Sequence, residues 1–474
     1  MADLLQADIC VVGAGSAGLT VAAGASQLGA PTILVEGGAM GGDCLNFGCV
    51  PSKALLAAAH AARAVADAAA FGVAAGPARV DFARVHDHVR AVIAGIAPVD
   101  AEERYAGLGV RVIRAHGRFV APDLLEAGGQ RIRARRFVLA TGSTPLVPPI
   151  PGLDRVPYLT NETIFDLVER PDHLVVIGGG PIGCELAQAH RLLGARVSIV
   201  EAASLLPKDD PELVDIVRRQ LLDDGVTLEE GARVTAVEPG PAGVAVRFER
   251  DGVAGRVDGS ALLVAAGRRA RTADLGLEAA GIAYGPRGIE VDAGLRTTNR
   301  RVYAIGDAVG AYPFTHVAGY HAGLVIRSAL FRLPARVDAR AIPWVTYTAP
   351  ELAHVGLAEV AARRRAGEIR ILRWPFAEND RARTERTTRG MIKVVTGRRG
   401  RILGASIVGP QAGELIQPWV LAIQQGLGIG AMARLIVPYP TLGEVGKRAA
   451  GSYFLPGLFG ERSRRLVRFL RRFG

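Results

Sequence analysis

The sequence predicts an α/β protein with two Rossmann-type domains, the first split by the second, and a smaller α+β domain at the C-terminal end. Three observations carry this prediction. A strand, glycine turn, helix and strand follow one another twice along the chain. Further strands that end in glycine come before and after the second copy, and the pattern changes after about residue 340. A length of 474 residues allows two to four domains.

The two copies are residues 8–36 and 173–201, and their registers agree without a gap. At a constant offset of 165 positions, Gly13, Gly15, Gly18, Gly29 and Glu36 match Gly178, Gly180, Gly183, Gly194 and Glu201. Each copy opens a helix with Gly-x-Gly-x-x-Gly and ends a strand with an acid eighteen residues after the last glycine. This arrangement suits a pyrophosphate at the helix N-terminus and a ribose beside the acid, so the sequence predicts two dinucleotide sites.

Two cysteines directly follow the first copy, in the segment GGDCLNFGCVPSK (residues 41–53). Cys44 and Cys49 are separated by four residues, which brings their sulfurs within bridging range if a helix begins here. A helix N-terminus lowers the pKa of a thiol, and such a pair exchanges two electrons as dithiol and disulfide. A pair of buried structural thiols is the less favoured alternative. Because the first copy leads into the cysteines, FAD suits the first site and a nicotinamide suits the second.

The acid of the second copy also bears on which nicotinamide binds. A carboxylate at Glu201 accepts a hydrogen bond from a free 2′-hydroxyl and repels a 2′-phosphate. No arginine follows it closely. The sequence therefore favours NADH over NADPH.

Composition excludes several other classes of protein. The formal net charge is +11, mostly from arginine, yet no basic helix interleaved with aromatic residues occurs before the extreme C-terminus, so we expect no nucleic-acid partner. Cys10 and Cys184 lie in apolar βα units and are expected to be small core residues, which is not a secreted disulfide framework. No metal-site spacing of His, Asp and Glu is present, and no basic signal segment opens the chain. A cytoplasmic location is expected.

Residues 41–53 resemble the redox-active segment of the flavoprotein disulfide reductases, a family that includes dihydrolipoamide dehydrogenase, glutathione reductase and mercuric reductase. The resemblance implies that Cys49 lies against the flavin and that Cys44 faces the substrate. It also implies that Lys53 lies beside the flavin with Glu185 as its partner, and that Asp307, in VYAIGD, binds the ribitol chain. Asp307 as a helix cap, His316 as an ordinary packed histidine, and Lys53 and Glu185 as surface or capping charges remain alternatives. The expected cofactor contacts are Gly13, Gly15, Gly18, Glu36, Gly42, Lys53, Thr141, Gly142, Gly178, Gly180, Gly183, Glu201, Gly267, Asp307 and His316.

The expected domains follow from the same motifs. Residues 1–150 form the first part of the FAD-binding domain, 151–270 the NAD-binding domain and 271–338 the second part of the FAD-binding domain. Residues 339–455 resemble the family's interface domain, which makes a homodimer with an active site shared across the interface. Long helices are expected at 54–70 and 85–105, and strands of a mixed, antiparallel-type sheet at 344–356, 390–395 and 402–408.

One position departs from the disulfide-reducing members of the family. These carry a histidine as acid and base near the C-terminus, followed by a glutamate that orients it. Here Tyr439 stands at the histidine position, and Glu444 is in place. A phenol with a pKa near ~10 is a poor proton shuttle at neutral pH. Mercuric reductase also has a tyrosine there, because reducing a thiolate-bound metal ion requires no proton for a leaving thiol.

The leading hypothesis is therefore a FAD-dependent NAD(P)H oxidoreductase whose exit is the Cys44/Cys49 pair. The acceptor is expected to be a soft metal ion or an electrophilic small molecule. Dihydrolipoamide dehydrogenase is the alternative within the family, and a flavoprotein redox sensor or binding module without turnover is the alternative from another class. Against mercury as the specific acceptor, the chain has no cysteine after Cys184.

The tail, residues 456–474, is basic and amphipathic in its last part. Such a tail usually packs on its own dimer or is disordered, and peripheral contact with an anionic membrane is the less favoured alternative.

Overall fold

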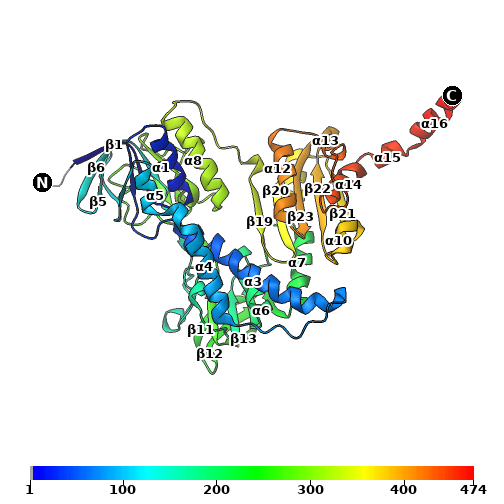
Figure 1. The fold of residues 1–474 in the computed structure, drawn as a ribbon, viewed down its shortest axis with the longest axis horizontal. Helices are drawn as coiled ribbons and strands as arrows, with labels where there is room; N and C mark the ends of the chain where they lie inside the picture. The colour runs from blue at the N-terminus through cyan, green and yellow to red at the C-terminus, as the bar shows by residue number, and fades with distance from the viewer. Residues whose placement is uncertain (1–3, 474) are drawn as a thin grey trace. The chain divides into compact units, whose positions relative to one another are not determined.

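The computed structural model describes residues 4–473, and the chain divides into two compact units. Unit 1 comprises Met1–Ala202 and Thr227–Val337, and unit 2 comprises Ala203–Val226 and Asp338–Gly474. Figure 1 shows the elements of both units by their labels.

The largest sheet of unit 1 has the strand order β3-β2-β1-β6-β5-β4, and β18 pairs with β6. β1, β2, β3, β6 and β18 are parallel, whereas β4 and β5 make an antiparallel edge. The carboxyl ends of parallel strands meet at one edge of a sheet, where ligands of such folds bind. The strands are β1 (Leu4–Val12), β2 (Thr32–Val35), β3 (Val110–Ile113), β4 (Arg118–Ala121), β5 (Leu124–Ala127), β6 (Gln130–Leu139) and β18 (Val302–Ala304).

Two helices of this part, α1 and α3, are rich in alanine, so they approach their neighbours closely. α1 packs against α8, and a Cβ built on Gly24 of α1 would lie 2.5 Å from Ile326 Cδ1. α3 packs against α4 and α6. The helices are α1 (Ser16–Gln27), α2 (Gly42–Asn46), α3 (Cys49–Asp67), α4 (Phe82–Asp100), α5 (Glu102–Gly107), α6 (Pro181–Leu192) and α8 (Thr315–Ala329).

Two predicted helices of unit 1 differ in their bounds. α3 begins at Cys49 itself and is followed by a 3-10 turn, Ala68–Phe71. The helix expected over 85–105 is two helices, because α4 ends at Asp100 shortly after Pro98 and Ala101 is extended (φ −68°, ψ 150°). By length and composition, one stretch among the described residues, Gly42–Phe71, is able to cross a membrane. One such helix is weak support for a membrane span, and this one packs within unit 1.

The second copy of the repeat builds a smaller sheet with the order β10-β9-β8-β14, in which β8 is parallel to β9 and β14. An antiparallel sheet, β11-β12-β13, follows it in sequence. Two short strands, β7 and β15, pair where the chain enters and leaves this region. The strands are β7 (Ser143–Pro145), β8 (His173–Ile177), β9 (Arg196–Glu201), β10 (Val226–Glu230), β11 (Arg233–Gly240), β12 (Gly243–Arg250), β13 (Val253–Gly259), β14 (Ala261–Val264) and β15 (Arg268–Ala270).

Unit 2 is built on a five-stranded sheet with the order β19-β20-β23-β22-β21. Every pair in it is antiparallel. The expected antiparallel type of sheet is therefore confirmed, and in the described part of the chain the sheet contains no parallel pair that would make it mixed. The single strand expected over 344–356 is two strands, because the chain turns at Pro350 between them. β21 was not predicted. The strands are β19 (Pro343–Thr346), β20 (Glu351–Gly356), β21 (Arg370–Pro375), β22 (Met391–Thr396) and β23 (Ile402–Gly409).

The helices of unit 2 include one from the middle of the chain. α7 lies inside the range expected for the NAD-binding domain, yet it packs against β20 and β23 of unit 2. Leu213, Val214, Val217 and Leu221 form its buried face. The helices are α7 (Pro211–Asp223), α9 (Glu359–Ala366), α10 (Asp380–Thr384), α11 (Ala412–Leu415), α12 (Gln417–Gln424), α13 (Ile429–Ala433), α14 (Glu444–Ser452), α15 (Leu455–Leu458) and α16 (Glu461–Leu470).

A buried lysine fastens α7 to the sheet of unit 2. Lys393 of β22 is 5% exposed, and its Nζ lies 2.7 Å from Asp210 Oδ2, 2.8 Å from Glu212 Oε2 and 2.8 Å from Glu359 Oε2. Asp210 is buried as well and caps α7 by accepting a hydrogen bond from Glu212 N. Removing one partner of a buried ion pair leaves an uncompensated charge, which is costly.

We therefore expect Lys393→Met to lower the free energy of unfolding of unit 2 by roughly 3 kcal/mol, because three carboxylates lose their shared cation. Urea unfolding followed by tryptophan fluorescence measures it, since all three tryptophans, Trp344, Trp374 and Trp419, lie in unit 2. Arg363→Ala is the matched control: Arg363 pairs with the same Glu359 but is 59% exposed, so we expect a loss below about 1 kcal/mol. Equal losses in the two variants would contradict this account.

Candidate active site

Both glycine turns require glycine for the same physical reasons. Gly13 and Gly178 have φ of +107° and +113°, and a Cβ on either would lie 2.3 or 2.5 Å from a backbone oxygen of the neighbouring strand turn. A Cβ on Gly18 or Gly183 would lie 1.8 or 2.0 Å from the oxygen of the first glycine. The two turns therefore have the same tight geometry, in which helix and strand touch without side chains.

The two acids close these turns in the same way. Glu36 Oε2 accepts a hydrogen bond of 2.5 Å from Ala14 N, and Glu201 Oε2 accepts one of 2.6 Å from Gly179 N. The donor and the acceptor of the second hydrogen bond are thus each 165 positions after those of the first, as the matched residues of the two copies are. Both carboxylates lie at the end of the second strand of their copy, beside the glycine turn.

The two turns fit dinucleotides. α1 and α6 are twelve residues long, begin after Gly15 and Gly180, and have no side-chain cap on their first N–H groups. A Cβ on Gly180 would meet nothing within 4 Å, and one on Gly15 would meet only Gly42 Cα at 3.9 Å. Free N–H groups in open space at a helix N-terminus bind a phosphate favourably.

The cysteine segment is fastened to the first glycine turn. Gly41 N donates a 2.9 Å hydrogen bond to Ala14 O, and Gly15 and Gly41 form a parallel bridge. A Cβ on Gly42 would lie 2.7 Å from Gly15 Cα, so the backbones touch. α2 with Cys44 and the start of α3 with Cys49 therefore lie beside the first dinucleotide turn.

The two cysteines are thiols within hydrogen-bonding range of each other. Cys49 is the first residue of α3, and its Sγ lies 3.4 Å from Oγ1 of Thr315, the first residue of α8. Hydrogen bonds from Cys44 and then from Thr315, together with the charge of Lys53, lower the pKa of Cys49 to about 6 against the opposing effects of burial and of Asp43. The pKa of Cys44 is raised, first by its hydrogen bond to Cys49. At neutral pH the pair therefore holds one thiolate, on Cys49.

An ion pair stands one turn beyond Cys49. Lys53 Nζ lies 2.8 Å from Oε2 of Glu185, which belongs to α6; the lysine side chain is 38% exposed and the glutamate 6%. The pair thus links the helix of the cysteines to the helix of the second glycine turn. The sequence expected these two residues to be partners, and the structure brings them together.

Besides Thr315, four further residues of the site were missed. Arg268 Nη2 lies 3.1 Å from Asp43 Oδ1, and Arg268 Nε donates to Ser143 Oγ at 2.8 Å. Ser143 Oγ in turn donates to Asp307 Oδ2 at 2.5 Å, and burial raises the pKa of that carboxyl group. Asn161 donates to Asp43 Oδ1 at 3.1 Å. Arg268 therefore connects Asp43, the residue before Cys44, with Asp307, the residue expected to bind the ribitol chain.

Sequence signals for these residues were weak. Thr315 stands beside His316 in a segment that the sequence does single out, and Arg268 directly follows a glycine that ends a strand. A threonine or arginine next to such a motif belongs to no recognisable pattern in the sequence, so its partner in the fold cannot be identified from the sequence.

The remaining predicted cofactor residues lie near the β7–β15 crossing or at α8. Thr141 Oγ1 donates to Arg271 O at 2.8 Å, Gly142 O accepts from Arg271 N at 2.9 Å, and Gly267 O accepts from Leu146 N at 2.9 Å. His316 stacks on Phe314 with ring centroids 5.3 Å apart. His321 is buried, Gly306 N donates to its Nδ1, and burial lowers its pKa to about 4.

Tyr439 and Glu444 belong to unit 2. Tyr439 is 71% exposed, and its hydroxyl donates to Asp380 Oδ2 at 3.2 Å. The charge of Asp380 and this hydrogen bond raise the pKa of Tyr439. Glu444 is the first residue of α14.

Comparison with known proteins decides the family. The family described as pyridine nucleotide-disulphide oxidoreductase matches residues 7–322, and its dimerisation domain matches residues 342–450. The chain is a pyridine nucleotide-disulphide oxidoreductase. The predicted family and fold class, two Rossmann-type domains and a C-terminal α+β domain, are confirmed.

The relatives of this oxidoreductase carry different names. Mercuric reductase of Streptomyces lividans is 34% identical over 94% of this chain and 96% of its own length. Dihydrolipoyl dehydrogenase of Geobacillus stearothermophilus is 35% identical with the same coverage, 94% and 96%. Among solved structures, the Cu(II) complex of the HOCl-induced flavoprotein disulfide reductase RclA from Escherichia coli has a TM-score of 0.83 and 29% identity, covering 93% of this chain and 98% of that one.

The family uses FAD and NAD(P)H, and the two glycine turns fit these dinucleotides. When bound, the two cofactors supply the two-electron hydride chemistry that delivers reducing equivalents to the cysteines. The chain's own part is to bind them at Gly15 and Gly180, to hold Lys53 against Glu185, and to keep Cys49 as a thiolate. Among residues 4–473, no group of three or more His, Cys, Asp or Glu side chains is placed to hold a resident metal ion.

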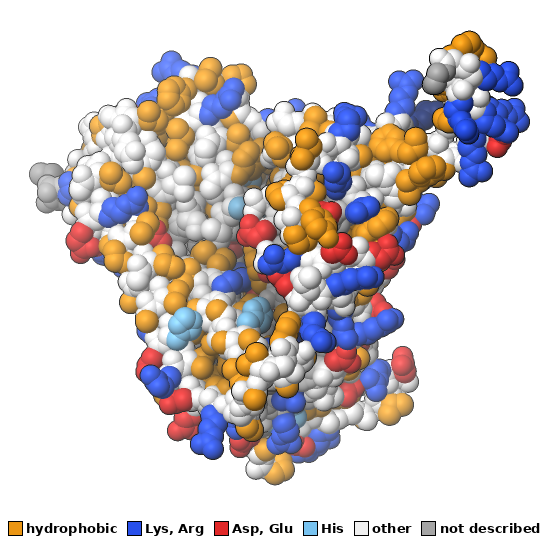
Figure 2. Space-filling model, turned by 45° about the vertical axis from the view of Figure 1, so that its right-hand side comes forward, with side chains coloured by type: hydrophobic (Ala, Val, Ile, Leu, Met, Phe, Trp, Pro, Cys, Tyr) orange, Lys and Arg blue, Asp and Glu red, His pale blue; other side chains and the backbone are white. Residues whose placement is uncertain are grey.

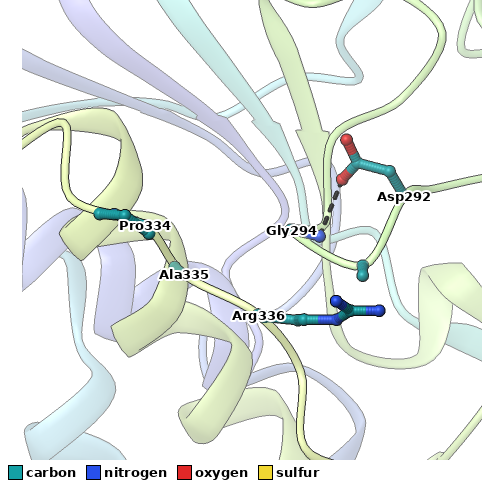
Figure 3. A pocket seen from close by; sticks show the side chains of 6 residues that line it. Asp292, Gly294, Pro334, Ala335 and Arg336 are labelled. Atoms are coloured by element: carbon teal, nitrogen blue, oxygen red, sulfur yellow. Dashed lines mark hydrogen bonds between the residues drawn. The ribbon is translucent and has the colours of Figure 1, made fainter.

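A surface hollow of about 500 Å³ lies elsewhere in unit 1 (Figure 3). It is lined by Asp292, Ala293, Gly294, Pro334, Ala335 and Arg336. Asp292 Oδ1 accepts hydrogen bonds from Gly294 N and Arg296 N, so this carboxylate holds its own loop in shape. None of the predicted site residues lines this hollow, and we assign it no part in the reaction.

The low pKa of Cys49 gives a direct test in the reduced oxidoreductase. The thiolate fraction rises as pH rises through about 6, so we expect alkylation of Cys49 by iodoacetamide to reach half its maximal rate near that pH. Thr315→Val removes a hydrogen bond to the thiolate and is expected to move this midpoint to higher pH, whereas Thr315→Ser retains the hydroxyl and the midpoint. Peptide mapping by mass spectrometry assigns the label. A midpoint near ~8.5, the ordinary thiol value, would refute the assignment.

Proposed function

We propose that this oxidoreductase passes two electrons from NADH through the Cys44/Cys49 pair to a soft metal ion presented as a thiolate complex, or to a comparable electrophilic small molecule. The observation that carries the proposal is Tyr439, an exposed phenol with a raised pKa at the position where disulfide-reducing members have an acid–base histidine. A group of this kind neither takes nor gives a proton readily at neutral pH.

The proton balance separates the two classes of acceptor. Reduction of a disulfide releases two thiols, and each leaving sulfur must gain a proton. A thiolate-bound Hg(II) ion needs no such step: two electrons convert it to Hg(0), its two sulfur ligands leave as thiolates, NADH becomes NAD⁺ and one proton is released. Soft ions bind thiolates in preference to oxygen ligands, so Cys44 and Cys49 suit this acceptor.

The names of relatives support a soft-metal acceptor without selecting it. Relatives at 32–34% identity are called mercuric reductases, and the RclA structure was solved as a Cu(II) complex. Because no cysteine follows Cys184, we propose that the ion reaches the Cys44/Cys49 pair directly, without a second pair that would hand it over.

The proposal includes NADH as the reductant and the cytoplasm as the location. The carboxylate of Glu201 lies beside the second glycine turn, where it favours a free ribose hydroxyl over a phosphate. Rates with NADH and NADPH at equal concentration measure this preference, and Glu201→Ser should narrow it by about tenfold if one repulsion of roughly 1.4 kcal/mol is removed. The location is proposed because four cysteines, two of them expected in the core, do not make a secreted disulfide framework.

We also propose a homodimer, supported by the match of residues 342–450 to the dimerisation domain. In this arrangement, Tyr439 and Glu444 of one subunit serve the cysteines of the other. The exposure of Tyr439, at 71%, leaves its side chain available for such a contact.

A panel of acceptors tests the function. We expect NADH oxidation with thiol-complexed Hg(II) to exceed that with lipoamide by at least about tenfold in kcat/KM, because only lipoamide needs a proton at the leaving sulfur. Fast lipoamide reduction would overturn the proposal in favour of dihydrolipoamide dehydrogenase. Failure of every acceptor to reoxidise the NADH-reduced protein would favour a redox sensor or binding module.

A further inference from the structure

The last two helices lie beyond the parts of the chain that define its family. The oxidoreductase match ends at residue 322 and the dimerisation match at residue 450, whereas α15 (Leu455–Leu458) and α16 (Glu461–Leu470) follow. In Figure 1 they continue from α14 at the C-terminal end. No residue of either helix is buried in the chain. These helices therefore add nothing to the core of unit 2.

α16 has one apolar side. Leu466, Phe469 and Leu470 follow the spacing i, i+3, i+4, which places them on one face of the helix, and Val467 borders it. Phe473, just beyond the end of α16, continues the same spacing. The rings of Phe469 and Phe473 meet edge to face, with centroids 5.1 Å apart. All five side chains are exposed: Leu466 56%, Val467 56%, Phe469 53%, Leu470 53% and Phe473 74%.

The opposite side of α16 is strongly basic. Six arginines stand against a single acid, Glu461, in the last fourteen residues. Arg464, Arg465 and Arg468 lie on the face away from the apolar residues, and Arg465 and Arg468 share Glu461. Figure 2 shows Lys and Arg side chains crowded on this C-terminal segment, with hydrophobic side chains at its tip.

α15 extends the apolar surface. It is a short turn of helix that exposes Leu455 at 43% and Leu458 at 60%, and Phe459, directly after it, is 63% exposed. Ser463 Oγ donates a 2.8 Å hydrogen bond to Gly457 O, which fixes the start of α16 against the end of α15. The apolar residues of the two helices thus belong to one hydrogen-bonded segment, which we call the C-terminal arm (residues 455–473).

We propose that the C-terminal arm docks this protein on an anionic lipid surface. In that position the apolar face enters the boundary between headgroups and acyl chains, and the arginines extend to the lipid phosphates on the polar side. Guanidinium groups bind phosphate in a bidentate manner, and several of them near an anionic surface add their attractions.

Charge favours lipid over a second copy of the chain as the occupant. The whole chain carries a formal net charge of +11, so another copy offers the arm a surface that is positive on average. A phosphate-rich surface complements both sides of the arm at once: acyl chains meet Leu466, Phe469 and Leu470, and headgroups meet the arginines. The inference does not depend on which acceptor the active site uses.

Co-sedimentation of the purified full-length holoenzyme tests the proposal. We expect binding to vesicles that contain phosphatidylglycerol and little binding to vesicles of phosphatidylcholine alone. Truncation after Gly460 should lower binding to the anionic vesicles by about tenfold or more, because it removes the six arginines and the apolar face. The double variant Leu466→Ser, Leu470→Ser keeps every charge and should also bind weakly. Val253→Ser, which changes a still more exposed apolar residue (69%) in unit 1, is the matched control and should bind as the parent does.

Several results would overturn the proposal. Equal binding of full-length and truncated protein would show that the arm is not the contact. Unchanged binding of the double variant would show that the apolar face takes no part and that the arginines bind the vesicles through non-specific charge attraction alone. A truncated protein that turns from dimer to monomer, with no vesicle binding by the parent, would assign the apolar face to a second copy. Ferricyanide reduction by NADH should remain the same in all variants, because none of these residues belongs to the active site.

Discussion

Cys49→Ser is expected to lower acceptor-dependent oxidation of NADH by a factor on the order of 10³ or more, because the Cys44/Cys49 pair can then no longer exchange two electrons as dithiol and disulfide. The hydrogen bonds from Cys44 and Thr315 and the charge of Lys53 hold the pKa of Cys49 near 6, so its sulfur is mostly thiolate at neutral pH. A serine hydroxyl in the same place stays protonated. Steady-state turnover with thiol-complexed Hg(II) and with lipoamide measures the loss.

Two controls make this result specific. Reduction of ferricyanide by NADH does not require thiols and should persist in Cys49→Ser, which shows that the protein is folded and binds its cofactors. Cys10→Ala changes a cysteine that is fully buried in β1, and it should retain acceptor turnover apart from a modest loss of stability. Cys44→Ser should behave like Cys49→Ser. Turnover that survives either serine variant would mean that electrons leave the protein by another path.

Tyr439→His is expected to raise lipoamide reduction by ~10²–10⁴, the usual worth of a positioned acid–base group. The phenol of Tyr439 has a raised pKa because Asp380 lies beside it. An imidazole in the same place titrates near neutral pH, and the Asp380 carboxylate would stabilise its protonated form. Glu444 already stands five residues further on, so the substitution completes the histidine–glutamate order of the disulfide-reducing relatives. The reduction of thiol-complexed Hg(II) should change little, since it needs no such proton.

Tyr439→Phe tests whether the hydroxyl group or only the aromatic ring of this residue affects turnover. It removes the hydroxyl and keeps an aromatic side chain, so lipoamide turnover should remain as low as in the parent protein. Adding Glu444→Gln to Tyr439→His should reverse part of the gain, because the carboxylate would no longer orient the imidazole. No gain in Tyr439→His would mean that other residues select the acceptor, and that the tyrosine is not the cause.

Local features of the site could be read from the sequence because short-range backbone geometry dictates them. Gly13 and Gly178 have positive φ and abut a neighbouring backbone oxygen, so no other residue satisfies the turn, and the repeat stands out at its constant offset. Glu36 and Glu201 each stand at the end of the second strand of their copy, where the carboxylate accepts a hydrogen bond from the glycine turn. Lys53 and Glu185 were expected as partners only through the resemblance to a family, since 132 positions separate them.

Long-range contacts could not be derived in this way. Thr315 contacts Cys49 across 266 positions of sequence. The whole second copy of the repeat lies between Asp43 and Arg268 in the sequence, so no periodicity reveals either contact. α7 has the composition of an ordinary amphipathic helix, and nothing in its own residues shows that its apolar face is covered by a sheet beginning more than a hundred positions later. The strand β21 was missed because its arginines and tryptophan do not alternate as a half-buried strand usually does.

The place of α7 has a consequence for dividing the protein. The polypeptide passes between the two units three times, near residues 202, 226 and 337, so no single cut of the gene yields either unit whole. A fragment that stops at residue 337 would keep α7 but lose the strands over Val217 and Leu221, and it would expose Asp210 and Glu212 without Lys393. Either unit, made as a separate protein, would therefore have to be joined from two pieces of the chain.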